Sequence, residues 1–156
     1  GTSVIELPSS DILILGNSFS TNGNITDALG SCDIVLSKLA SNGEVKEVKN
    51  IGTKGFETAN SFIRRPDGTL VLVGHSNNES NILDYQKIGN DIALFYTLEN
   101  GIVIKKNNLG GIGFDSGNDL IYDHSGKLIV VGSTENISEE ILKSESNKNI
   151  FIAIWH

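Results

Sequence analysis

The chain is poor in several residue types, and each scarcity excludes a class of protein. Its 156 residues include a single cysteine, Cys32, so neither an intrachain disulfide nor a thiolate metal site can form. Two prolines and the absence of any block of like charge are untypical of a disordered chain. No apolar run approaches the roughly 20 residues that span a bilayer as a helix, so we expect no membrane insertion by this chain itself.

Positive charge is also scarce. The chain has 12 Lys and Arg against 19 Asp and Glu, a formal net charge of −7. Nucleic acids and anionic membrane surfaces bind proteins through clustered basic side chains, so neither is expected as a partner. The 38% apolar content suffices for one globular core.

A repeat of 58 residues organises the whole chain. Gly16, Gly74 and Gly132 are 58 positions apart, and the same step, without any gap, joins five further sets: Asp33, Asp91 and Asn149; Gly43 and Gly101; Gly52 and Gly110; Phe56 and Phe114; Gly68 and Gly126. A period of this length with strand-like content predicts a repeat architecture.

Each repeat contains a series of short strands, named a to d in chain order. Strand a begins at Ser3, Ser61 and Asp119, and an aliphatic strand b follows, which we expect to be buried on both faces. Strand c opens at the repeated Asp33, Asp91 and Asn149. Strand d is expected at residues 44–50 and 102–108, after the Asn-Gly pairs that favour tight hairpins. Its charged residues suit an outer edge.

Four antiparallel strands per repeat predict an all-β fold made of β-propeller blades at about residues 1–58, 59–116 and 117–156. The third blade lacks its outer strand. Because propellers close with roughly four to eight blades, we expect residues 1–156 to form an incomplete ring. Further sequence, a second copy or a different protein subunit would complete it at the edge formed by Ile150–Trp155.

The long b–c connections are the expected site of function. In a blade whose strand a lines the axis, they emerge on the same face as the d–a connections, and loops gathered on a rigid scaffold commonly carry binding residues. Their sequences differ between repeats, which favours one composite surface over identical sites. The candidate ligand-binding residues of this rim are Phe19, Asp27, His75, Asp84, Tyr85 and Glu139.

Catalytic and metal-binding patterns are missing. Asn149 replaces the repeated aspartate and cannot act as an acid or base, and the three histidines are scattered. Glu57 and Asp115 could contribute to a cation site, but the spacing of a calcium loop is absent. We therefore expect no catalytic residue, metal or cofactor, and structural roles for two repeated pairs. Phe56 and Phe114 should pack between blades, and Asn60 and Asn118 should satisfy backbone groups near strand a.

The repeat resembles the SBBP-type β-propeller repeat of secreted and surface-exposed bacterial proteins. The resemblance is carried by Asp33–Leu39, Asn42-Gly43, Gly55-Phe56, Ala59-Asn60-Ser61 and Pro66-Asp67-Gly68, and it covers nearly the whole chain. It implies an extracellular or outer-surface location and a scaffold or binding role, and it brings no shared catalytic residues. The third repeat departs from the pattern at Asn149 and near Trp155.

The expected function is therefore a non-enzymatic binding or scaffold subunit of a bacterial surface propeller, which engages protein or glycan through the b–c loops. Two alternatives remain open. One is a carbohydrate-active enzyme fragment that uses rim carboxylates, and the other is a structural accessory subunit of an outer-membrane complex.

Overall fold

The structure is a computed structural model, and it describes residues 1–23, 25, 27–77, 89–110, 113–135 and 149–155. These residues form eleven β-strands and no helix, as the sequence predicts. The strands make three antiparallel sheets, so the all-β class is confirmed.

Each sheet corresponds to one sequence repeat, and its strands pair in chain order. The first sheet contains β1 (Ser3–Glu6), β2 (Ile12–Ser18), β3 (Asp33–Leu39) and β4 (Val45–Ile51). The second contains β5 (Phe56–Arg64), β6 (Leu70–Asn77), β7 (Asp91–Thr97) and β8 (Val103–Leu109). The third contains β9 (Ser116–Tyr122), β10 (Leu128–Thr134) and β11 (Asn149–Trp155).

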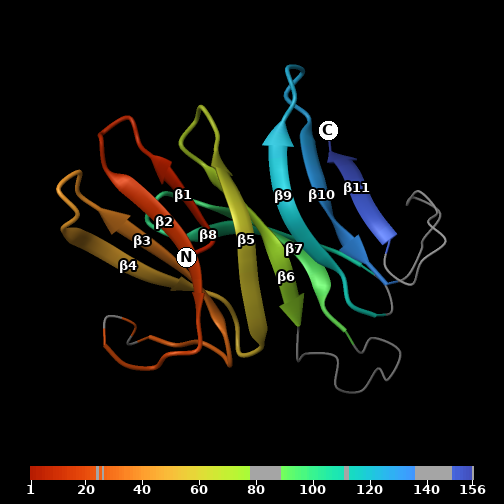
Figure 1. The fold of residues 1–156 in the computed structure, drawn as a ribbon, viewed down its shortest axis with the longest axis horizontal. Helices are drawn as coiled ribbons and strands as arrows, with labels where there is room; N and C mark the ends of the chain where they lie inside the picture. The colour runs from red at the N-terminus through yellow and green to blue at the C-terminus, as the bar shows by residue number, and fades with distance from the viewer. Residues whose placement is uncertain (24, 26, 78–88, 111–112, 136–148, 156) are drawn as a thin grey trace.

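The three sheets lie in a row, with the second between the other two (Figure 1). Strand β5 packs against β2 of the first sheet and against β9 of the third. The first and second sheets meet at what we call the first junction, and the second and third sheets meet at the second junction. The three sheets do not close into a ring.

Glycines form the tight turns that the sequence predicts. Gly43 and Gly101 turn between the third and fourth strands with φ of 88° and 77°, a left-handed conformation that glycine adopts without steric cost. Gly68 and Gly126 do the same between the first and second strands, with φ of 88° and 82°. The first repeat has Ser10 at this place, and Ser10 takes the left-handed conformation itself, with φ of 66°.

The inner strands begin earlier than the sequence suggests. Residues 52–60 were expected to form a connection, but β5 starts at Phe56 and runs through a β-bulge between Ala59 and Ser61. The third sheet repeats the irregularity, because Val131 pairs with Asp119 and Gly132 with Gly117. Asn60 and Asn118 are the extra residues at the two bulges. The early start of these strands was not predicted because their first residues are largely polar, and because a bulge interrupts the alternation of apolar and polar residues.

Two apolar layers hold the sheets together. At the first junction, Leu13, Leu15 and Ile34 of the first sheet pack with Phe62 and Leu72 of the second. A separate cluster fills the second junction and consists of Val71, Val73, Ile92, Leu94, Leu120, Leu128 and Val130. Most of these side chains are wholly removed from solvent, and burial of each aliphatic side chain stabilises the fold by about 1.5–3 kcal/mol.

The aliphatic b strands differ in burial although their sequences are alike. In β6, residues Leu70 to Val73 are all buried, as expected for a strand covered on both faces. In β2 and β10, buried and more exposed residues alternate. The expectation of two-sided burial is therefore correct for the second sheet and wrong for the other two, because a neighbouring sheet covers only one face of each.

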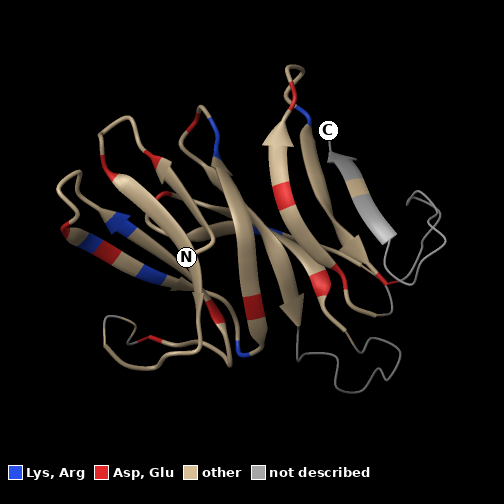
Figure 2. Ribbon diagram, in the orientation of Figure 1, with Lys and Arg blue, Asp and Glu red and all other residues tan. Residues whose placement is uncertain are grey.

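The outer strand of the first sheet is rich in charged residues. Lys46, Glu47 and Lys49 follow one another along β4, at the edge of the first sheet (Figure 2). Charged edge strands discourage pairing with another sheet. Their position confirms the predicted outer edge of the first repeat. Among the described residues, no helix is long and apolar enough to cross a membrane.

Candidate functional site

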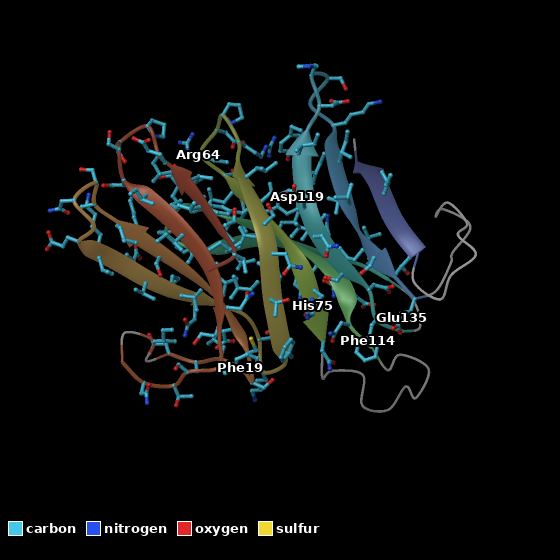
Figure 3. The ribbon with its side chains drawn as sticks, in the orientation of Figure 1. Phe19, Arg64, His75, Phe114, Asp119 and Glu135 are labelled. Atoms are coloured by element: carbon cyan, nitrogen blue, oxygen red, sulfur yellow. The ribbon has the colours of Figure 1, made fainter. Side chains whose placement is uncertain are left out.

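In the described part of the chain, the connections between the second and third strands of a sheet meet the connections between adjacent sheets at one edge, as predicted. The connection before β3 bonds to the connection before β5, with Ser31 N–H donating to the Gly55 carbonyl at 2.9 Å and Glu57 N–H to Cys32 at 2.9 Å. The second junction repeats the latter bond, because Asp115 N–H donates to the Asn90 carbonyl at 2.7 Å. This edge, which we call the rim, is the lower edge in Figure 3.

Asp33 and Glu57 fix the rim at the first junction. The Asp33 carboxylate accepts hydrogen bonds from the backbone N–H groups of Leu29 and Gly30, at 2.7 and 3.2 Å. Glu57 is completely buried and accepts bonds from Thr53 N–H at 2.8 Å and from the Ser76 hydroxyl at 3.2 Å. Asp33 therefore fixes the turn before β3, and Glu57 holds the connection before β5 in the same way.

The two carboxylates of this pair lie close together because the residue between them is a glycine. A Cβ atom at Gly52 would lie 2.5 Å from Asp33 Oδ1 and 3.0 Å from Glu57 Oε2. Gly110 is in the corresponding place at the second junction, between Asp91 and Asp115. The repeated glycine thus leaves room for a repeated acid pair.

Lys106 adds a positive charge beside these acids. Its Nζ donates to the Ser76 hydroxyl at 2.9 Å and lies 5.0 Å from the centre of the Phe95 ring. Burial lowers the pKa of Lys106, while the nearby carboxylates of Glu57 and Asp91 act in the opposite direction. Ser76 therefore links the half-buried ammonium group of Lys106 to Glu57.

At the first junction, three aromatic side chains pack together at the rim. Phe56 lies between Phe19 and His75, with ring centroids 5.9 Å from Phe19 and 5.8 Å from His75. The Phe56 and His75 planes differ by only 11°, a stacked arrangement. The prediction that Phe56 packs where two repeats meet is confirmed.

At the second junction, the equivalent positions carry no such stack. The repeat places Phe114 where Phe56 lies, but Asn77 replaces Phe19 and Ser133 replaces His75. Phe114 is consequently 57% exposed, so its predicted packing between repeats is wrong. Its backbone N–H donates to Glu135 Oε2 at 3.0 Å.

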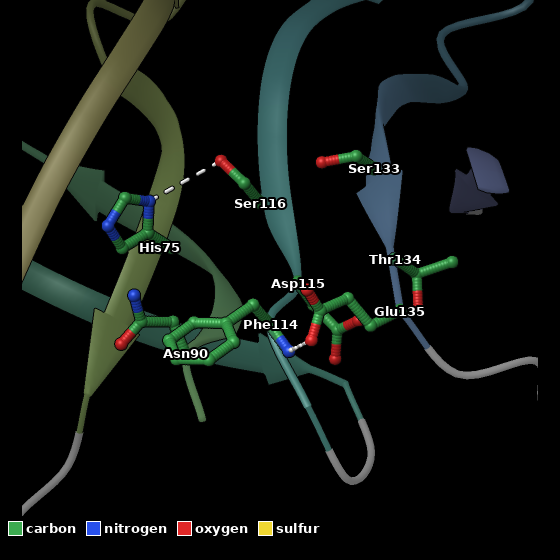
Figure 4. A pocket seen from close by; sticks show the side chains of 8 residues that line it. All are labelled: His75, Asn90, Phe114, Asp115, Ser116, Ser133, Thr134 and Glu135. Atoms are coloured by element: carbon green, nitrogen blue, oxygen red, sulfur yellow. Dashed lines mark hydrogen bonds between the residues drawn. The ribbon is translucent and has the colours of Figure 1, made fainter. Parts of the chain in front are cut away.

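A cavity of about 200 Å³ opens beside Phe114. It is lined by residues of the second and third sheets, namely His75, Asn90, Phe114, Asp115, Ser116, Ser133, Thr134 and Glu135 (Figure 4). A phenyl ring, an imidazole, two carboxylates, an amide and three hydroxyl groups thus surround one small space. Two carboxylates give it negative charge, and none of the described lining residues is Lys or Arg.

His75 takes part in both junctions. Its Nδ1 lies 3.0 Å from the Thr58 hydroxyl and 3.4 Å from the Ser116 hydroxyl, across the second junction. Burial lowers the pKa of His75, which favours the neutral imidazole. The ring therefore stacks on Phe56 with one face while its edge borders the cavity.

The structure brings only part of the predicted rim set together. His75 lies within strand β6 and not in the loop after it, and it lines the cavity. Phe19 is 72% exposed and belongs to the first junction, and Asp27 is exposed on the connection between β2 and β3. Asp84, Tyr85 and Glu139 lie outside the described residues.

Sequence reasoning missed most of the cavity. Phe114 was assigned to packing, and Asn90, Ser133 and Glu135 were not singled out for binding. The signal was present in the alignment of the repeats, since Phe19, Phe56 and His75 correspond to Asn77, Phe114 and Ser133. A position that is aromatic in one repeat and polar in the next indicates that the two junctions are filled differently.

Asn60 has the expected structural role. Its Nδ2 donates to the Gly117 carbonyl at 2.8 Å, across the second junction. In the first repeat, Thr2 takes this position, and its hydroxyl donates to the Ala59 carbonyl at 3.0 Å. Asn118, the third member of the set, is exposed.

A comparison with protein-family models finds no match to this chain, and a comparison with curated proteins finds none either. The resemblance to the SBBP-type repeat therefore stays a prediction.

Proposed function

We propose that this chain is a non-enzymatic binding module whose three sheets are blades of a β-propeller. The support for the blade arrangement is the agreement between sequence repeat and structure. Each sheet is an antiparallel meander in chain order, and adjacent sheets use equivalent positions at their junctions, such as Thr2 and Asn60. Blades of a propeller are four-stranded sheets related by such repetition.

The ligand site of this module is the cavity at the second junction. One observation carries the assignment: the same repeat positions are filled by rings in contact with Phe56 at the first junction and leave Phe114 uncovered at the second. An exposed aromatic ring beside convergent polar groups is typical of a small binding site. The cavity has room for one side chain or one small ring.

The ligand is the cationic side chain of an Arg or Lys residue in a protein partner. Asp115 and Glu135 supply negative charge, and the exposed face of Phe114 offers a cation–π surface worth about 0.5–1 kcal/mol at a partly exposed site. The net charge of −7 attracts a basic partner over a longer range. His75 adds no competing charge when its imidazole is neutral.

The test is a titration with N-acetyl-arginine amide, followed by amide chemical shifts, with N-acetyl-citrulline amide as the uncharged control of the same shape. We expect the arginine compound alone to shift the signals of residues around the cavity. Glu135→Gln should weaken binding several-fold because it removes a negative charge beside the ligand. Phe114→Ala should weaken it about three- to fivefold through loss of the cation–π contact.

Phe19→Ala is the matched control, because it removes an exposed phenylalanine from the other junction and should leave arginine binding unchanged. Equal shifts with the citrulline compound would contradict a cationic ligand. If free hexoses shifted the same signals and arginine did not, the ligand would be a glycan and the present assignment would be wrong.

The proposed location is the outer surface of a bacterial cell, and its support is the resemblance to SBBP-type repeats. Protease treatment of intact cells is the corresponding test. We expect the chain to be cleaved in intact cells, and protection until the cells are lysed would contradict the location.

A further inference from the structure

The third sheet has an exposed apolar face. Ile121 on β9 is 56% exposed, Val131 on β10 is 39% exposed and Ile152 on β11 is 47% exposed. Val131 and Ile152 are direct register partners, so their side chains share one face of the sheet. The opposite face carries Leu120, Leu128 and Val130, which pack with the second sheet, so this face looks away from that sheet. We call it the trailing face.

The repeat shows what normally covers such a face. Ile121, Val131 and Ile152 correspond to Ile63, Val73 and Leu94 of the second sheet. Val73 and Leu94 are 0% and 1% exposed, and Ile63 packs against the same cluster at the second junction. In the first sheet, Leu15 and Leu36 hold the equivalent positions and are buried against the second sheet. Both internal trailing faces are therefore covered by the next sheet.

The first sheet has the complementary exposed face. Val4 is 62% exposed, although its counterparts Phe62 and Leu120 are buried at the two junctions. Ile12 and Ile14 are only partly buried, whereas Leu70 and Leu72 at the same repeat positions are fully buried. We call this the leading face. The chain thus carries both halves of its internal junction on exposed surfaces.

We infer that the trailing face of one copy of this chain packs on the leading face of a second copy. This contact has the same arrangement as the two internal junctions, because the same apolar repeat positions pack against each other in all three. It also continues a series of hydrogen bonds between adjacent sheets, from Thr2 to Ala59 and from Asn60 to Gly117. One repeat further along, the donor position is Asn118, and the acceptor position is taken by Gly1 of the second copy. Both of these residues are exposed in one copy.

Two copies joined in this way at both faces form a closed ring of six sheets. That number lies within the roughly four to eight blades of known propellers. A head-to-tail contact closes into a ring when its rotation allows, and otherwise grows into an open filament. The inference rests on the blade arrangement of the proposed function but not on its ligand.

Asp119 limits the strength of this contact. It pairs with Val131 in the β9–β10 register and therefore shares the trailing face. Its counterparts in the other repeats are Ser3 and Ser61. A carboxylate that becomes buried on association loses hydration, so Asp119→Ser should strengthen the association about tenfold or more.

The experiment measures the mass of the chain by sedimentation velocity over a concentration series. We expect twice the 16.7 kDa mass of one copy. Ile121→Lys and Val4→Lys should each weaken the dimer at least tenfold, since each places a charge in both contacts. Both residues are more than half exposed, so neither substitution disturbs the fold of a single copy. Ile104→Lys is the matched control, because Ile104 is 54% exposed on β8, away from both faces.

An equimolar mixture of Ile121→Lys and Val4→Lys tests the head-to-tail arrangement. In a mixed dimer one of the two contacts has no substitution, so the mixture should regain dimers that neither variant forms alone. A monomer over the whole series overturns the inference, and so does a ladder of larger assemblies or a dimer sensitive to only one variant. A monomer that still binds N-acetyl-arginine amide overturns the interface alone and leaves the ligand proposal standing.

Discussion

The imidazole of His75 lies parallel to the phenyl ring of Phe56, with centroids 5.8 Å apart and 11° between the planes. Burial among these groups lowers the pKa of His75, so the folded state prefers the neutral ring. The same side chain borders the cavity at the second junction through Ser116. Packing at one junction therefore favours the neutral form of a residue that borders the next.

Stability should consequently depend on the protonation of His75. Because its pKa is lower in the folded than in the unfolded chain, the unfolded chain binds more protons as the pH falls below the ordinary value of about 6.5. The contribution is fully present above that value and is lost toward the folded pKa. We expect the free energy of unfolding, measured with urea, to fall between neutral pH and mildly acidic pH.

His75→Gln is the control for this prediction, because it removes the titrating group. The decline of stability just below neutral pH should be smaller in this variant than in the unchanged protein. An NMR titration that gave His75 a pKa at or above the ordinary value of about 6.5 would contradict the prediction.

The strands and their order could be predicted because the evidence for them is local. Asn42-Gly43 and Asn100-Gly101 determine hairpins by backbone conformation, and the aliphatic runs ending at Gly16, Gly74 and Gly132 provide the central strands. The early start of β5 could not be predicted in this way. Its first residues are polar, and their strand conformation depends on pairing across a bulge with β6.

The turn at Ser10 offers a test of stored backbone strain. Ser10 has φ of 66°, where the other two repeats have glycine at φ of 88° and 82°. A left-handed conformation costs a residue with a Cβ roughly 1–2 kcal/mol, and glycine avoids this cost but loses more chain entropy. Ser10→Gly should therefore raise the free energy of unfolding by about 0.5–1 kcal/mol, measured by urea denaturation.

Gly126→Ser is the reverse change at the equivalent turn. A Cβ at Gly126 meets no atom within 4 Å, so the substitution tests conformation without a steric clash. It should destabilise the protein by about 1 kcal/mol. If Ser10→Gly left the stability unchanged or lowered it, the left-handed conformation at this turn would not be strained.

Gly52 is expected to tolerate no side chain. A methyl group there would lie 2.5 Å from Asp33 Oδ1 and 3.0 Å from Glu57 Oε2, and both carboxylates are buried and held by hydrogen bonds. Gly52→Ala should therefore destabilise the protein by about 1–3 kcal/mol, measured by thermal or urea unfolding. Gly110→Ala should act in the same direction at the second junction.

Gly16→Ala is the control for space, since a Cβ at Gly16 meets no atom closer than 3.4 Å. Its effect on stability should stay within about 0.5 kcal/mol. Equal losses for Gly16→Ala and Gly52→Ala would show that crowding by the acid pair is not what makes alanine unfavourable at Gly52.

The cavity could not be predicted from the sequence because it is a difference between two junctions. His75 was found as a polar residue near a loop, yet its strand position, its stacking on Phe56 and its contact with Ser116 depend on how three sheets pack. Phe114 was expected to be buried because Phe56 is. Its exposure follows from Asn77 and Ser133, which lie far from it in the sequence and have little meaning until the repeats are superposed.

Two substitutions should give the second junction the aromatic packing of the first. Asn77→Phe combined with Ser133→His places at the second junction the residue types that cover Phe56 at the first. The two new rings should cover Phe114, and each aromatic pair should stabilise the fold by about 0.5–1.5 kcal/mol. Because the cavity is then occupied by the protein's own side chains, the double variant should lose binding of N-acetyl-arginine amide while its free energy of unfolding rises. Stabilisation without loss of binding would place the ligand elsewhere on the rim, whereas loss of binding with loss of stability would mean that the second junction cannot adopt the packing of the first.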